Sequence, residues 1–101
     1  MSKSDWRWCE REWAQGRIAV KRLSDSNANL KYFTLRIGEE VAKRNSVGRL
    51  SMGYRGKVKE GYCAVDVIPQ PVVWYEVSRS GKEPFKAGQE ELGKVGEKAM
   101  R

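Results

Sequence analysis

Basic side chains are the residues of this sequence best suited to binding chemistry, and they concentrate in one segment. Residues 30–61 hold eight basic and three acidic residues, and no acidic residue lies between Glu40 and Glu60. An acid-free basic stretch is the electrostatic footprint of a protein that binds a polyanion. The sequence therefore predicts a nucleic-acid-binding segment over 43–59 that contacts phosphates. Its candidate residues are Lys43, Arg44, Arg49, Arg55, Lys57 and Lys59.

A second pair of cations, Arg79 and Lys82, flanks a turn predicted at Ser80-Gly81. Serine and glycine are typical turn residues because they accept the unusual backbone conformations that turns require. We count both cations among the candidate nucleic-acid-binding residues. Tyr54 and Trp74 have two interpretations: they stack on unpaired bases, or, as we prefer, they pack in the core.

The N-terminal segment is rich in tryptophan and arginine. Trp6, Cys9 and Trp13 recur at i, i+3 and i+7, which places them on one face of a helix, and Trp8 lies off that face. Because tryptophan and arginine are enriched at binding hot spots, the off-face residues form a candidate surface for a protein partner. The candidate partner-binding residues are Arg7, Trp8 and Arg11.

Nucleophilic and metal-assisted catalysis are disfavoured by the residue types present. The chain contains no histidine, which excludes Ser-His-Asp and Cys-His nucleophile pairs and any histidine-containing zinc site. Two cysteines, Cys9 and Cys63, are too few for a Cys₄ site, and we expect them to be buried free thiols in a reducing cytoplasm. Glu39 and Glu40 are adjacent and point roughly 100° apart on a helix, so they form no acid/base pair. We therefore expect no enzyme, no cofactor and no metal.

Chain length and hydropathy limit the architecture. The 101 residues are enough for one domain, 1–101. No apolar run approaches the roughly 18 residues of a membrane span, and the N-terminus shows no apolar region of a secretion signal. We expect a protein that contacts no membrane.

The first half of the chain is predicted to be largely helical. Asp5, with Ser2 and Ser4, caps a helix from about Trp6 to about residue 15, which ends at Gly16. Residues 17–23 either continue this helix or form a strand. Apolar residues at i, i+3, i+7 and i+11 predict an amphipathic helix over 30–44, with a strand over 30–37 as the second choice. Those apolar residues are Leu30, Phe33, Ile37 and Val41, and Asn29 is the expected N-cap.

The second half carries the clearest strand signals. Two β-rich runs, 62–68 and 72–78, are separated by Pro69-Gln70-Pro71 and predict a hairpin. Alternation places Cys63, Val65 and Val67 on one face with Val73, Tyr75 and Val77, and leaves the other face half exposed. Residues 49–55 are a strand, a short helix or a loop. Pro84 suits the first position of a C-terminal helix over 84–101, which its glycines weaken, so that it is helical or partly frayed.

These elements together predict a small single α+β domain. It has an N-terminal helix, a central β-hairpin or small antiparallel sheet, and a C-terminal helix. Residues 74–82, an aromatic strand followed by serine and a Gly-Lys turn, resemble the last wing strand of winged helix-turn-helix proteins. Residues 38–44 are similar to the first helix of their helix-turn-helix. The resemblance implies a recognition helix within 48–59, although three glycines in that segment depart from the family's pattern.

Two functions from different classes follow. The first is a small basic regulator, such as a transcription regulator, that binds DNA or RNA through the 43–59 segment. The alternative is a small phage-type inhibitor or adaptor that binds a larger host protein or ribonucleoprotein complex. The sequence leaves the choice between DNA, RNA and a protein partner open, together with the oligomeric state, a homodimer included.

Overall fold

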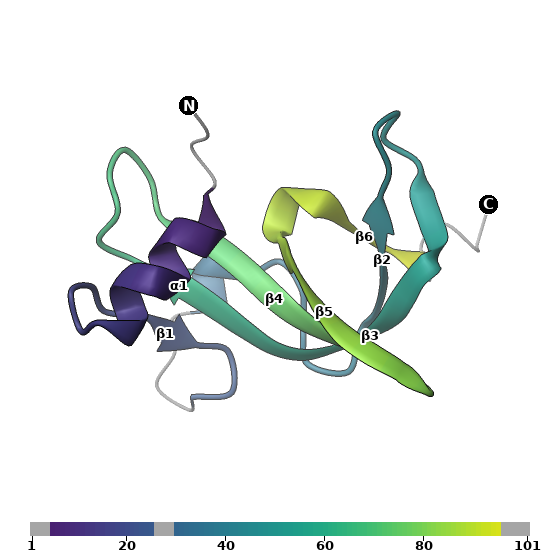
Figure 1. Cartoon of the computed structure of the whole chain (residues 1–101), viewed down its shortest axis with the longest axis horizontal. Coiled ribbons are helices and arrows are strands. Elements are labelled where there is room, and N and C mark those ends of the chain that lie inside the picture. The colour runs from purple at the N-terminus through teal and green to yellow at the C-terminus, as the bar shows by residue number, and fades with distance from the viewer. Residues whose placement is uncertain (1–4, 26–29, 96–101) are drawn as a thin grey trace.

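The computed structural model describes residues 5–25 and 30–95, and it is built mainly from antiparallel strands (Figure 1). One short helix precedes the sheet, and two single 3₁₀ turns interrupt it. In chain order the elements are α1 (Trp6–Ala14), β1 (Lys21–Arg22), η1 (Leu30–Tyr32), β2 (Glu40–Arg44), β3 (Leu50–Ala64), β4 (Val72–Arg79), β5 (Lys82–Gly88), η2 (Gln89–Glu91) and β6 (Leu92–Lys94).

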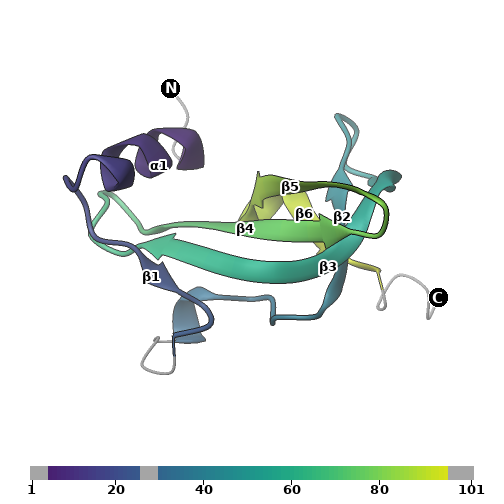
Figure 2. The same ribbon diagram turned by 60° about the horizontal axis from the view of Figure 1, so that its bottom comes forward.

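The sheet is organised around β3, its longest strand at 15 residues. The strand order is β5-β4-β3-β2-β6, and β1 pairs with the C-terminal part of β3. All pairings are antiparallel, and irregularities interrupt β2–β3, β3–β4 and β4–β5. Such bulges bend a strand and increase its twist. Figure 2 accordingly shows β3 and β4 curving side by side beneath α1. The predicted helix–sheet–helix layout is therefore wrong: residues 5–25 and 30–95 form a six-stranded antiparallel sheet with one N-terminal helix.

The N-terminal helix forms where the sequence predicts it. The Asp5 side chain accepts a hydrogen bond from the backbone N–H of Trp8 at 3.1 Å, and Gly16 reverses the chain with φ of 74°. Trp6 and Cys9 are buried against the sheet, while Trp8 is exposed. The other caps proposed, Ser2 and Ser4, lie outside the described residues.

The helix predicted over 30–44 does not form. A single 3₁₀ turn is followed by an irregular segment and then by β2, whose Val41 pairs with Gly56 of β3. Ile37, expected on the buried face, is 49% exposed, whereas Leu35 is buried in the core. The helical spacing of these four apolar residues is coincidental: Leu30 lies in η1, Val41 lies in β2, and the two between them lie in the irregular segment. The proposed cap Asn29 lies outside the described residues.

The predicted hairpin is confirmed as β3 and β4, but β3 begins already at Leu50. Cys63, Tyr75 and Val77 share a buried face, as alternation predicts, whereas Val65 and Val67 lie beyond the end of β3. The opposite face is also buried at one end, because α1 covers Trp74 there. Two clusters of apolar side chains therefore pack on the two sides of this sheet.

The predicted C-terminal helix is wrong. Phe85 and Ala87 alternate as strand residues and pair with Val77 and Tyr75, so residues after Pro84 continue in β5, η2 and β6. Residues 96–101 lie outside the described residues. The winged-helix resemblance fails at the same time, since 40–44 and 50–59 are strands and no recognition helix is present in either. The turn at 79–82 is confirmed, with Gly81 at φ of 71°.

Neither α1 nor any other helix in the described part of the chain is long and apolar enough to cross a membrane.

Candidate nucleic-acid interface

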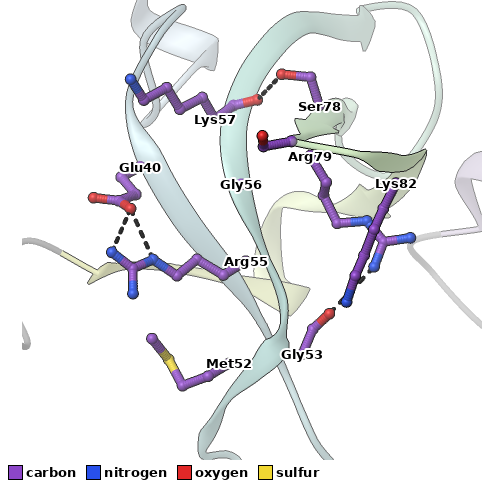
Figure 3. Close-up of a pocket in the computed structure, with 10 residues that line it drawn as sticks. Glu40, Met52, Gly53, Arg55, Gly56, Lys57, Ser78, Arg79 and Lys82 are labelled. Carbon is purple, nitrogen blue, oxygen red and sulfur yellow. Dashed lines mark hydrogen bonds and ion pairs between the residues drawn. The ribbon is translucent and has the colours of Figure 1, made fainter.

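An open trough of about 640 Å³ lies where β3 passes the β4–β5 turn (Figure 3). This turn is at the end of the sheet distant from α1 (Figure 1). We call this trough the basic trough because four of its lining side chains are cations and one is a carboxylate. In Figure 3, Arg55 and Lys57 lie on one side of the β3 ribbon, and Arg79 and Lys82 lie on the other. The lining residues are Glu40, Met52, Gly53, Arg55, Gly56, Lys57, Ser78, Arg79, Ser80 and Lys82.

The middle of the trough is backbone because β3 and β4 approach closely at Gly56. A Cβ atom at this position would lie 2.1 Å from the carbonyl oxygen of Ser78 and 2.8 Å from Cγ1 of Val77. Only glycine, which lacks Cβ, permits this approach. Gly56 therefore serves close strand packing and an open floor, whereas a Cβ atom at Gly53 would meet only Oγ of Ser51, at 3.9 Å.

Lys57 and Lys82 are the cations of the trough with the greatest freedom to bind a ligand. Both are exposed, and among the described residues neither side chain takes part in an ion pair. The Ser78 hydroxyl donates to the Lys57 carbonyl oxygen at 3.3 Å, and the exposed Ser80 adds a second hydroxyl to the lining. Ammonium and hydroxyl groups are common phosphate ligands in nucleic-acid complexes.

Arg55 is partly neutralised by Glu40. The Glu40 Oε2 atom lies 2.7 Å from Nε and 2.6 Å from Nη2 of Arg55, so the guanidinium donates twice to one carboxylate oxygen. The two side chains remain 44% and 40% exposed, which leaves their pairing open to competition by another anion. Among the described residues, Glu40 is the one carboxylate in the lining.

Arg79 is a structural part of the trough more than a free cation. Its Nε donates to the Glu83 carbonyl oxygen at 2.8 Å, and its Nη1 donates to the Gly53 carbonyl oxygen at 3.2 Å. These bonds tie β3 to the β4–β5 hairpin and fix the guanidinium in place.

Four of the eight nucleic-acid-binding candidates, Arg55, Lys57, Arg79 and Lys82, line the trough, and the other four lie around it. Lys43 stands 5.7 Å from the ring centre of Tyr54, and Lys59 lies on the β3 bulge, 4.0 Å from Glu76. Arg44 donates to the Gly48 carbonyl oxygen at 3.2 Å, and Arg49 is exposed beside it in the β2–β3 turn.

Sequence reasoning missed the non-cationic members of the trough. The sequence predicts Ser78 only as a strand residue and Ser80 only as a turn residue, and it places Glu40 in a helix. Strand alternation alone places Ser78 on the same face as Lys57, its partner in register, so a correct β3–β4 pairing would have found it.

The partner-binding candidates lie at the opposite end of the molecule, on α1 (Figure 1). Trp8 is 42% exposed and Arg11 is exposed, whereas the Arg7 guanidinium lies 4.6 Å from the ring centre of Trp6. The two candidate surfaces are therefore separate.

Polar groups beneath α1 attach this helix to the sheet. Glu10 accepts from Nε1 of Trp74 at 3.1 Å and from Nζ of Lys86 at 2.6 Å. Burial lowers the pKa of Lys86, but the hydrogen bond to Glu10 and its charge outweigh burial, so the net pKa is raised. These contacts fix α1 and take no part in the trough.

Cys9 and Cys63 are buried free thiols, as predicted. Burial, with a smaller contribution from Cys9, raises the pKa of Cys63 to about 11. Within residues 5–25 and 30–95, no group of three or more cysteine and carboxylate side chains is placed to hold a metal ion.

Comparisons with protein-family models, curated proteins and solved structures find no match to this chain.

Proposed function

We propose that this protein is a small nucleic-acid-binding regulator that contacts phosphates through the basic trough. The observation that carries the proposal is the pair Lys57 and Lys82. Both are exposed on one open trough whose floor is backbone, neither forms an ion pair with another described residue, and serine hydroxyls lie beside them. The chain's formal charge of +7 adds a long-range attraction for any polyanion. We further propose that the protein acts in the cytoplasm, where buried free thiols such as Cys63 stay reduced.

The test is the salt dependence of nucleic-acid binding, measured by fluorescence anisotropy with labelled DNA and RNA oligonucleotides. Each protein–phosphate contact on duplex DNA contributes roughly 0.9 to the slope of log K against log salt. The double variant Lys57→Gln/Lys82→Gln is therefore expected to reduce the slope by about 1.8 and to weaken binding most at low salt.

A matched control removes the same charge elsewhere. Lys21 and Arg22 are exposed on β1 and pair with the other end of β3. The variant Lys21→Gln/Arg22→Gln should leave the slope almost unchanged. If the two double variants lower the slope equally, binding is only a general attraction by net charge. If the trough variant leaves the slope and the affinity unchanged, the proposal is overturned.

A protein partner remains the second candidate, favoured by the exposed Trp8 and Arg11 on α1. Large exposed tryptophans beside arginines are typical of interface hot spots. Failure of the protein to bind any oligonucleotide at low salt would leave this surface as the candidate, in the role of an inhibitor or adaptor of a larger complex.

A further inference from the structure

A partly exposed aromatic cluster lies beside the basic trough. Tyr54 is 47% exposed and packs edge-on against Phe85, with ring centres 5.6 Å apart and planes at 84°. Two cations lie over the same tyrosine: Arg79 at 5.3 Å and Lys43 at 5.7 Å from its ring centre. We call Tyr54, Phe85, Arg79 and Lys43 the aromatic ridge.

The ridge belongs to the other face of the strands that form the trough. Phe85 pairs in register with Val77, a buried core residue, whereas Arg55 and Lys57 point into the trough. Tyr54 is absent from the trough lining although it directly precedes Arg55. Trough and ridge are therefore the two sides of one projecting end of the sheet.

Arg79 connects the two sides. It lines the trough, its hydrogen bonds to Glu83 and Gly53 hold it in place, and its guanidinium lies 5.3 and 5.4 Å from the two ring centres. A fixed cation against an aromatic ring restricts the ring's motion. The exposed part of Tyr54 is thus a preorganised surface for a flat ligand that carries negative charge nearby.

We propose that the ligand of this end of the molecule is single-stranded nucleic acid, whose phosphates lie in the basic trough and one of whose bases stacks on Tyr54. This inference rests on the proposed function and adds the strand state of the ligand. Base–aromatic stacking requires a base with a free face, which a single strand offers and a continuous duplex does not. A single strand is also flexible enough to pass around the edge that separates trough from ridge. Lys43 and Arg79 complement the phosphates on the ridge side.

The test compares a labelled single-stranded oligonucleotide with a duplex of the same sequence. Replacing Tyr54 with leucine should weaken single-strand binding by about 5- to 150-fold, the loss of one stacked base, and should leave duplex binding within about twofold. Tyr54→Phe retains the ring and should bind like the unsubstituted protein. An abasic single strand, which keeps the phosphates, should bind the unsubstituted protein and Tyr54→Leu equally.

The possible outcomes separate this inference from the proposed function. In one outcome, Tyr54→Leu lowers the affinity for single strand and duplex equally, or lowers neither, while Lys57→Gln/Lys82→Gln lowers both affinities. The trough then binds phosphates, and the stacking inference is overturned. If the unsubstituted protein binds neither oligonucleotide, the proposed function itself fails, and the inference with it. Retained duplex binding by Tyr54→Leu shows that this variant is folded, and retained single-strand binding by Tyr54→Phe shows that the ring, not the hydroxyl, is required.

Discussion

Replacing Glu40 with glutamine should strengthen nucleic-acid binding. Glu40 is the one carboxylate that the described part of the chain places in the trough, and it occupies two N–H groups of Arg55. The substitution removes a negative charge next to the expected phosphates and frees those donors. A gain of affinity is informative because damage to the fold cannot produce it.

The size of the gain follows from Coulomb's law. A phosphate on the free side of the Arg55 guanidinium would lie roughly 7 Å from the carboxylate, a repulsion of about 0.6 kcal/mol in water and about 2.4 kcal/mol at an effective dielectric constant near 20. Ions at 0.1 M screen roughly half of this repulsion over that distance. The expected gain is therefore about 0.3–1.2 kcal/mol, or a dissociation constant about 2- to 8-fold lower.

The assay is an anisotropy titration at several salt concentrations. Because a new contact between Arg55 and phosphate becomes available, the salt slope should rise by roughly 0.9 on duplex DNA or 0.7 on a single strand. Stability should fall by less than about 1 kcal/mol, since both members of the pair are well exposed.

The control for this experiment is Glu39→Gln, the same charge change at the neighbouring residue. Glu39 pairs with Lys94 at 3.4 Å and does not line the trough. It should change the affinity less than Glu40→Gln does. Unchanged or weaker binding by Glu40→Gln would refute the assignment of the trough.

Two predictions concern the framework that supports these sites. Gly56→Ala should cost at least about 2 kcal/mol in the free energy of unfolding, because its Cβ would meet the Ser78 carbonyl at 2.1 Å; a melting temperature equal to that of the unsubstituted protein would contradict this packing. A thiol reagent at pH 8 should label neither Cys9 nor Cys63 in the native state and both in denaturant, since burial raises both pKa values. The Cys63 thiolate, at a pKa of about 11 instead of 9.0, should be roughly 100-fold less populated at this pH, so rapid native labelling of that cysteine would argue against its burial.

The elements that sequence reasoning found are those whose signals are local. The cap at Asp5, the helical face of Trp6 and Cys9, and the glycine stop at Gly16 all lie within a few turns of one another. The β4 strand likewise has an uninterrupted β-rich sequence. The local sequence of each of these elements is therefore enough to predict it.

The elements that were missed depend on distant partners. The strand β2 is apolar only at Val41 and Ala42, and it is held between β3 and β6. β5 contains a proline, Pro84, that suggests a helix start, but it lies at the sheet edge, where no second strand needs its missing N–H. Pairing across the sheet decided both segments, and a single sequence does not display it.

The candidate site was predictable in composition but not in shape. The basic segment supplied Arg55 and Lys57, and the turn supplied Lys82, yet only the close approach at Gly56 brings them around one trough. Glu40 belongs to the site because the end of the predicted 30–44 helix is in fact the strand β2, which pairs with β3.

The placement of the four tryptophans gives the molecule a built-in optical asymmetry. Trp6, Trp8 and Trp13 lie on α1 and Trp74 lies beneath it, so all four indoles report on the helix end. Among the described residues, the trough lining holds no aromatic side chain, and the rings of the ridge are Tyr54 and Phe85. Emission excited at 295 nm would therefore follow the seating of α1 on the sheet. A ligand that fills the trough would change the signal only if the far end responds as well. A change in tryptophan emission on ligand binding would therefore show that binding at the trough alters the structure at the α1 end.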